Sequence, residues 1–373
     1  MAVVGWLIPG LVLGFLPVPV QSHETTAGRI SRHLRHVHHA IQWRGHVTVE
    51  SLTDLAGGAG RGTTGAMAAV GGLALDTRRL GGWTGGTFTA EVMGLERLPG
   101  RESRLVGDAQ GVSNLYNSFS FFRLIMLSYR QRIARQTLLR GGILDVNSYF
   151  DTTGTALDLL NSSFGMTPTV TVNVPLTPTA PYTGWGVVFR QGPMENRWRA
   201  GIFAGDPAAR GTLTQGAFLI GEWQRDPVPG ERFKIGAWLY HNPEGPSQGN
   251  LASPPTTDGI YGVWEDRSPE RGSEPGWFVQ AGLNPGAANY IPFYLGAGVR
   301  LRSLPGQNPL TAVTAGVARA WIRGHVPESA WEVAYDEDWT SEIMVEPDLQ
   351  YVMHPGGIYP DAWVFLLRLR GDF

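Results

Sequence analysis

The sequence has no cysteine, almost no lysine and few charged residues of either sign. Without cysteine, a disulfide framework, a thiolate metal site and a cysteine nucleophile are excluded. Lys234 is the only lysine, and the formal charge of -2 offers no electrostatic footprint for nucleic acid. Beyond the N-terminal region, no run of about 18 apolar residues lacks charges, which excludes a bundle of membrane-spanning helices.

Glycine and tryptophan are abundant instead. The 373 residues include 50 glycines, roughly double the average share of about 7%, and 13 tryptophans. This mixture is typical of a wall of many short strands, in which glycine makes tight turns and tryptophan anchors the strand ends. It fits a packed α/β core less well, so an all-β architecture is favoured.

The N-terminus has the features of an export signal. Residues 5–20 are apolar, and Val20-Gln21-Ser22 places small residues where a signal peptidase reads. The stretch is about 16 residues long and contains prolines, whereas a membrane anchor needs about 20 residues. The sequence therefore predicts a signal peptide over residues 1–22, an N-terminal arm over 23–42 and one barrel domain over 43–373.

The arm carries a cluster of histidines whose spacing could recruit a metal ion, namely His33, His36, His38 and His39. No acidic or cysteine ligand accompanies them in that short polar stretch. A solvated arm is therefore favoured over a metal site, and no cofactor or metal is expected in this protein.

From Trp43 onward, apolar and polar residues alternate with period two in runs of about ten residues, which is the pattern of membrane-barrel strands. In the last run the odd positions from Trp363 to Phe373 suit lipid, and the even positions become charged toward the end. The preceding run places acids on one face. We predict an antiparallel transmembrane β-barrel of about sixteen strands, closed because lipid tolerates no unpaired edge. The strands are expected to begin near Trp43, Met67, Gly86, Phe122, Leu138, Trp185, Trp198, Ala217, Phe233, Ile260, Trp277, Phe293, Thr311, Trp331, Thr340 and Asp361.

Several passages resemble one known family. Residues 331–335 and 346–357, together with 140–150 and 161–165, are similar to the carbohydrate-selective porin (OprB) family in sequence and order. The resemblance implies a sixteen-stranded barrel with a narrowed lumen that passes mono- and small oligosaccharides across the outer membrane of a Gram-negative bacterium. A strand ending in Phe373 looks like the signal that the barrel-assembly machinery reads. The family often has an arginine-aspartate turn in the region that matches residues 301–309, but this sequence has no acid there, so a shared role of that turn is not expected.

Strand alternation also predicts which side chains face the lumen, because an arginine facing lipid at the midplane costs about 2–4 kcal/mol. Each such residue either pairs along the wall or contacts sugar hydroxyls, with oppositely charged residues on the last two strands able to pair. Trp223 and Trp238 are candidates for stacking on sugars or for facing lipid. The lumen candidates are Arg140, Arg190, Arg199, Glu222, Glu265, Glu332, Glu346, Asp348, Gln350, Arg368 and Arg370.

The function expected from these observations is passive diffusion of small saccharides through a barrel held in outer-membrane lipid. An accessory or structural barrel for polysaccharide export or envelope assembly is the main alternative. An outer-membrane hydrolase has little support, since His325, Glu328 and Ser329 form no recognisable nucleophile motif. A secreted β-sandwich or lectin remains a third alternative, and the oligomeric state stays open.

Overall fold

The computed structural model describes residues 40–99, 102–209, 215–247, 254–267, 275–287, 289–302 and 311–373. The predicted signal peptide, the histidine cluster and all but the last residues of the predicted arm lie outside these ranges. No helix within the described ranges is long and apolar enough to cross a membrane.

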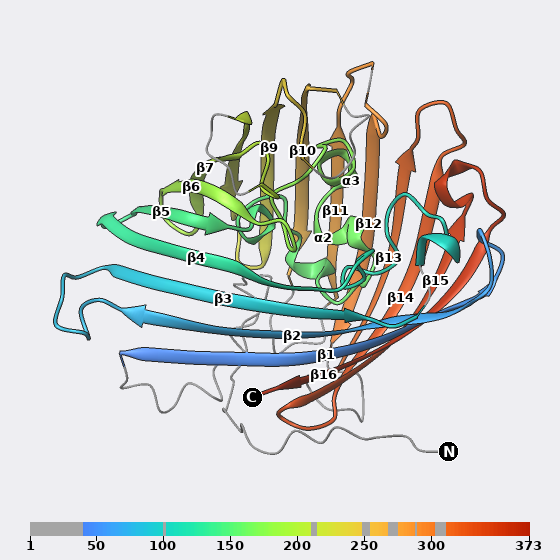
Figure 1. Ribbon diagram of the computed structural model, residues 1–373, viewed down its shortest axis with the longest axis horizontal. Helices are drawn as coiled ribbons and strands as arrows, with labels where there is room; N and C mark the ends of the chain where they lie inside the picture. Colours follow the sequence, from blue (N-terminus) through green and yellow to red (C-terminus); the bar gives the residue numbers. More distant parts are fainter. Residues whose placement is uncertain are drawn as a thin grey trace.

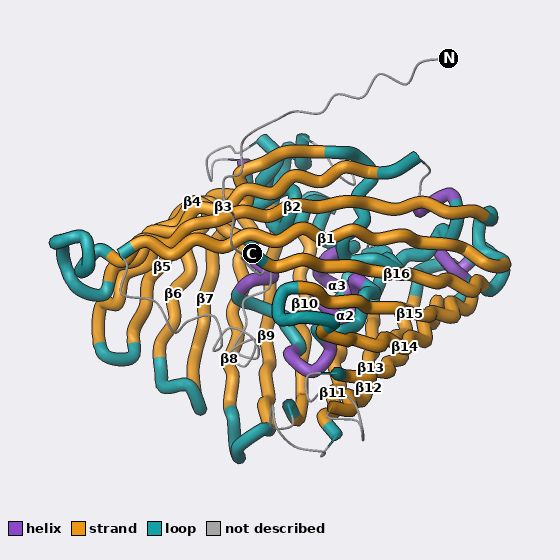
Figure 2. Tube along the Cα trace, turned by 90° about the horizontal axis from the view of Figure 1, so that it is seen from below, coloured by secondary structure: helices purple, strands orange, loops and turns teal. Residues whose placement is uncertain are grey.

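The described residues form sixteen antiparallel strands, each paired with its neighbours in sequence, and β16 pairs with β1 to close a barrel (Figures 1 and 2). The predicted fold is therefore confirmed. The strands are β1 (Ile41–Ala56), β2 (Gly62–Asp76), β3 (Gly86–Arg97), β4 (Phe121–Ala134), β5 (Thr137–Leu144), β6 (Gly184–Gln191), β7 (Asn196–Ala204), β8 (Ala217–Arg225), β9 (Glu231–His241), β10 (Thr256–Asp266), β11 (Gly276–Leu283), β12 (Phe293–Arg302), β13 (Ala312–Trp321), β14 (Glu328–Asp338), β15 (Ile343–Met353) and β16 (Ala362–Asp372).

Most strands, β1 at Ile41 included, begin within three residues of the predicted start. The two largest differences are β2, which begins at Gly62 rather than Met67, and β10, which begins at Thr256 rather than Ile260. In both places polar residues precede the apolar run, so the alternation is weak there. Pairing with a neighbouring strand extends the strand past the end of the pattern, as the partners Thr256 and His241 show.

The alternation sorts side chains between lipid and lumen as predicted. Along β16, Val364 and Leu366 are fully buried while Trp363 and Phe365 are exposed on the outside. Aromatic pairs lie near both ends of the barrel, for example Trp264 with Trp277 at 5.1 Å and Phe293 with Trp321 at 4.6 Å between ring centroids. Such belts are typical of the two membrane interfaces of an outer-membrane barrel.

The two ends of the barrel differ in their connections. At the end where β1 begins and β16 stops, here called the terminal end, the connections include residues 77–85, 135–136 and 192–195. At the opposite end, here called the loop end, two connections are long, residues 98–120 and 145–183. Both turn into the lumen, and Figure 1 shows α2 (Ser162–Gly165) and α3 (Pro168–Thr171) of the second one enclosed by the strands.

We name residues 102–120 the first infolded segment and residues 145–183 the second. The second carries η3 (Val146–Ser148) and η4 (Gly154–Ala156) besides its two short helices, and the first begins with η2 (Glu102–Arg104). Apolar residues of the second segment, such as Phe150 and Phe164, are fully buried against the inner wall. Val106 and Val112 of the first segment pack similarly against β1, β15 and β16. The lumen is therefore narrowed by packed protein rather than by a mobile flap.

Candidate functional site

All the predicted lumen residues lie on the inner face of the barrel, but they divide into two groups. The carboxylates and Gln350 are nearly inaccessible, with exposures of 0–3%, because the infolded segments cover them. The arginines remain partly exposed, as Arg199, Arg368 and Arg370 show with 15%, 12% and 28% of their side chains accessible. The buried acids and Gln350 are available only to the infolded segments, whereas the arginines are also accessible from the lumen.

Glu332 on β14 anchors the middle of the second infolded segment. Its carboxylate accepts hydrogen bonds from the backbone N–H groups of Leu160 and Asn161, the latter at 3.2 Å. Gln350 on β15 accepts from the Asn161 side chain at 3.2 Å and donates to the carbonyl of Val112 in the first segment at 2.8 Å. Infolded backbone has no strand beside it, so wall side chains supply the partners that buried N–H and C=O groups require.

Glu222 on β8 anchors the beginning of the same segment. It accepts from the backbone N–H of Asp151 at 3.1 Å, from the Tyr261 hydroxyl at 2.9 Å and from the Arg199 guanidinium at 2.7 Å. Glu265 on β10 anchors the following turn in the same way, since it accepts from the N–H of Thr155 at 2.8 Å. These acids therefore hold the constriction in place, and no oxygen of Glu222 is left over for a solute.

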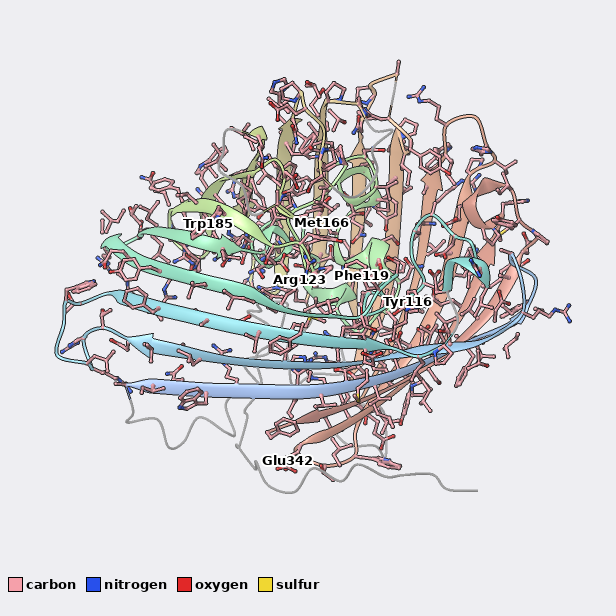
Figure 3. All side chains as sticks on the ribbon, in the orientation of Figure 1. Tyr116, Phe119, Arg123, Met166, Trp185 and Glu342 are labelled. Carbon is pink, nitrogen blue, oxygen red and sulfur yellow. The ribbon has the colours of Figure 1, made fainter. Side chains whose placement is uncertain are left out.

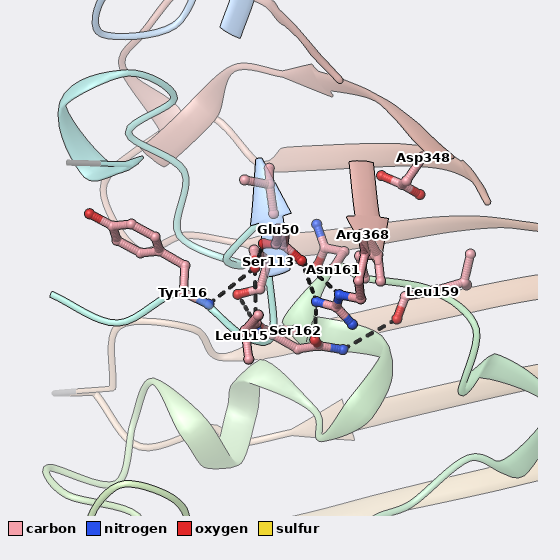
Figure 4. A network of polar contacts seen from close by, with 12 residues as sticks. Glu50, Ser113, Leu115, Tyr116, Leu159, Asn161, Ser162, Asp348 and Arg368 are labelled. Atoms are coloured by element: carbon pink, nitrogen blue, oxygen red, sulfur yellow. Dashed lines mark hydrogen bonds and ion pairs between the residues drawn. The ribbon is translucent and has the colours of Figure 1, made fainter. Parts of the chain in front are cut away.

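A polar network joins the first infolded segment to the place where the barrel closes (Figure 4). Arg368 on β16 makes an ion pair with Glu50 on β1, its register partner, and also donates to the Asn114 side chain at 2.8 Å. The Ser113 hydroxyl donates to the other oxygen of Glu50. The sequence allowed Arg368 to pair with an acid of β15, such as Glu346, but its ion pair is made across the closing seam, because β16 has a second neighbour whose acid lies closer.

Within the described residues, Arg140 and Arg370 make no ion pair with an acid on another strand, unlike Arg199 and Arg368. Arg140 on β5 donates to the Ser128 hydroxyl at 3.3 Å and lies 5.6 Å from the centre of the Tyr149 ring. Arg370 on β16 pairs, within the described part of the chain, only along its own strand, with Asp372 at 2.8 Å. Their remaining donors are available to a solute.

Neither tryptophan proposed for sugar stacking faces open lumen. Trp223 lies on the outer face, stacked on Trp198 at 5.9 Å with its indole N–H donated to Asn196. Trp238 points inward but is only 4% exposed, packed against Phe218 beneath the second infolded segment. Stacking on sugars by these two residues is excluded in this arrangement.

A cation–π cluster centred on Arg123 of β4 connects the two infolded segments to each other, and Figure 3 labels Arg123 and Phe119 of this cluster. The Arg123 guanidinium lies 4.6 Å from the ring centre of Tyr182 and 5.8 Å from that of Phe119, and those two rings are 5.8 Å apart. Phe119 lies at the end of the first segment and Tyr182 at the end of the second. The sequence pattern did not single out any of these residues, and no period-two signal could have found them.

Glu50, missed as a lumen residue, and Glu328, considered only as part of a hydrolase, are also anchors. Glu50 alternates with Val49 in β1, a signal that was present in the first strand but not used. Glu328 accepts from the N–H groups of Ala109, Gln110 and Gly356, which explains its full burial without any catalytic role. In the described residues, no group of three or more histidine, aspartate or glutamate side chains is placed to hold a metal ion.

Asp151, in the second infolded segment, provides a test of this anchoring by pH. Its carboxylate accepts from the N–H and hydroxyl of Thr167 at 2.9 and 2.7 Å, yet burial raises its pKa from 3.8 to about 6. A raised carboxyl pKa favours the folded state when protonated, so this stabilisation is complete below about pH 4, is lost as the pH rises toward 6, and is absent above that. About two pKa units correspond to at most about 3 kcal/mol.

Asp151→Asn removes the charge and tolerates the left-handed backbone of this position (φ 52°). We expect the variant to unfold at a higher temperature than the wild type in detergent at about pH 7.5, with the gain shrinking to nothing near pH 4. Asp361→Asn is the control, since hydrogen bonds from Tyr351 and the N–H of His354 lower the pKa of Asp361. Its neutralisation should bring no gain at the higher pH, and an equal gain in both variants would contradict the assignment.

Comparison with known proteins agrees with this geometry. The family model described as "Carbohydrate-selective porin, OprB family" matches residues 71–373. No curated protein matches the sequence significantly. Among solved structures, the high-pH structure of Pseudomonas putida OprB has a TM-score of 0.78 at 16% identity, covering 94% of this chain and 96% of that one. The low-pH structure of the same protein has a TM-score of 0.61 at 14% identity, covering 96% and 99%.

A mutant of the Rh. blastica porin is also similar, with a TM-score of 0.55 at 9% identity, covering 89% of this chain and all of the other. At these low sequence identities, the similar solved structures show only that this chain has a porin-barrel fold. The family match spans most of the sequence and indicates the class of solute, carbohydrates. The fold and the family together identify an outer-membrane sugar porin. Porins are normally non-enzymatic. With sixteen closed strands, an infolded constriction and the matched residues 71–373, this chain belongs to the carbohydrate-selective porin, OprB family.

Proposed function

We propose that the partly exposed arginines of the lumen are the residues that sugars touch, and that the buried acids only hold the constriction. The supporting observation is the difference in exposure between the two groups: 0–3% for the acids and Gln350 against 12–28% for the side chains of Arg199, Arg368 and Arg370. Arg140 and Arg190 are also partly exposed. Small, neutral, mono- and oligosaccharides are the proposed solutes.

Guanidinium groups suit this task physically. A sugar hydroxyl accepts a charge-assisted hydrogen bond from arginine, which is stronger than a bond between neutral groups. The sugar carries no charge, so binding stays weak enough for release, as conduction through a pore requires. Passage is therefore a succession of short-lived hydrogen bonds along the arginines between the constriction and the terminal end.

We infer that the barrel sits in the outer membrane of a Gram-negative bacterium with its terminal end toward the periplasm. Short periplasmic turns and longer external connections are the rule in such barrels, and the longest connections lie at the loop end. Exposed apolar residues such as Leu239 and Ile260 on the outer face would meet lipid. The C-terminal strand ending in Phe373 is the proposed contact for the barrel-assembly machinery.

Liposome swelling tests the proposal. Vesicles containing the protein are placed in isotonic pentose, hexose, disaccharide or trisaccharide, and we expect swelling rates to fall steeply with solute size. Arg140→Gln should change the concentration of glucose that half-blocks the ion current in planar bilayers. Arg225→Gln is the matched control, because Arg225 lies exposed on β8 on the face opposite Glu222. Absence of swelling in every monosaccharide would overturn the proposal.

A further inference from the structure

A pocket of about 340 Å³ opens at the terminal end of the lumen, away from the constriction. Its volume lies at the small end of the range of about 300–1,000 Å³ in which small-molecule sites fall. Its walls are the inner faces of β2 to β5 and the turn between β2 and β3. The lining residues are Asp76, Arg78, Thr84, Gly85, Gly86, Thr87, Arg130, Arg132 and Leu138.

The pocket is strongly positive. Three guanidiniums, of Arg78, Arg130 and Arg132, face one carboxylate, and Asp76 already accepts from the backbone N–H groups of Arg78 and Arg79 at 2.9 and 3.4 Å. Among the described residues, no carboxylate lies within 4.0 Å of any of these three guanidiniums. The positive charge is thus left for a solute to balance.

Arg130 is held in position but retains unused donors. One terminal nitrogen donates to the Thr87 hydroxyl at 2.9 Å, while its Nε is buried without a hydrogen-bond partner in the described part of the chain. A guanidinium has five N–H donors in a planar fork that matches a carboxylate. Gly85 shapes the opposite wall: its φ of 82° suits glycine, and a Cβ there would lie 3.1 Å from the Cβ of Arg132.

The positive charge continues from the pocket into the lumen. Arg130 is the register partner of Arg140 on β5, and within the described residues no ion pair balances either guanidinium. Like charges placed directly opposite on neighbouring strands repel each other and are destabilising by themselves. A bound anion would reduce the repulsion between the guanidiniums, whereas an uncharged sugar would leave it unchanged.

We propose that this pocket binds the carboxylate of a small sugar acid, such as a hexuronate, with Arg130 and Arg132 on the carboxylate and the threonine hydroxyls and Asp76 on the sugar hydroxyls. The inference rests on the proposed sugar-porin function and extends it from neutral to acidic saccharides. A guanidinium binds a carboxylate through two parallel hydrogen bonds, and this geometry favours a planar carboxylate over a spherical anion.

Current block in planar bilayers tests the site, with glucuronate, glucose, acetate and phosphate as probes. We expect glucuronate to block the current at lower concentration than glucose and than either simple anion. The double variant Arg130→Gln/Arg132→Gln should raise the half-blocking glucuronate concentration about tenfold or more, since hydrogen bonds between charged groups are lost. Arg225→Gln should not change it.

The outcomes separate cleanly. Equal block by acetate, phosphate and glucuronate would mean a general anion site and overturn the sugar-acid assignment. Unchanged glucuronate block in the double variant would overturn the site itself, and the single variant Arg132→Gln, at an exposed position, repeats this test if the double variant does not fold. Glucose entry without any glucuronate block would sink this inference alone, whereas failure of glucose entry would sink the proposed function.

Discussion

A barrel in which residues 146–182 are replaced by Asn-Gly is expected to conduct ions severalfold better than the wild type and to admit saccharides too large for it. Leu144 and Gly184 are register partners at the ends of β5 and β6, so the shortened connection spans the same gap as an ordinary hairpin turn of about four residues. The deletion removes the second infolded segment and leaves all sixteen strands.

The physical reason is that this segment fills the lumen with packed side chains. Its removal returns Glu222, Glu265 and Glu332 to water, which solvates carboxylates well, so the wall acids tolerate the loss of their backbone partners. The apolar wall around Phe218 and Trp238 becomes wet, which is the main cost to folding. Single-channel conductance and swelling with a graded saccharide series measure the effect.

A pair of point variants gives the same test without a deletion. Glu332→Gln keeps an acceptor oxygen for Leu160 and Asn161 and should conduct like the wild type. Glu332→Leu keeps the bulk but leaves two buried N–H groups without a partner, at a cost of about 1–3 kcal/mol each. It should show noisy, intermittently larger currents. A folded deletion variant with wild-type conductance would disprove the constriction.

Arg368→Ala is expected to destabilise the folded barrel by about 3–5 kcal/mol, because removing one partner of a buried ion pair strands the other charge. Glu50 is 1% exposed and Glu346, opposite Arg368 on β15, is 3% exposed, so both carboxylates lose their nearest cation. The measurement is the urea midpoint of unfolding from lipid vesicles, followed by tryptophan fluorescence.

Arg370→Ala is the matched control two residues along the same face. Among the residues that the structure describes, its guanidinium pairs only with Asp372, and both side chains are substantially exposed, so we expect a change of about 0–1 kcal/mol. Replacing the buried pair together, as Glu50→Leu/Arg368→Met, should recover the part of the loss that comes from stranding Glu50, since apolar residues of similar volume substitute well for a buried pair. Adding Glu346→Gln should recover the part that comes from Glu346. Equal effects of Arg368→Ala and Arg370→Ala would contradict the seam assignment.

The period-two pattern was sufficient to predict the barrel, the number of strands and the side of the wall on which each candidate charge lies. It could not predict the infolded segments. The alternation stops at Leu144, and residues 145–183 contain no periodic pattern that would indicate where this connection lies. Their partners are also far away in sequence: Gln110 bonds Glu328, 218 residues on. A bond between a side chain and a backbone N–H leaves no pattern in the sequence, so the acids were expected to pair along the wall or contact sugar hydroxyls, not to hold infolded backbone.

The Glu50–Arg368 network has a consequence for the order of assembly. Ser113 and Asn114 of the first infolded segment are fastened to residues of the first and last strands at once. The chain must therefore be complete, and its two edges joined, before that fastening exists. The first infolded segment therefore takes its final position only after the last strand has paired with the first.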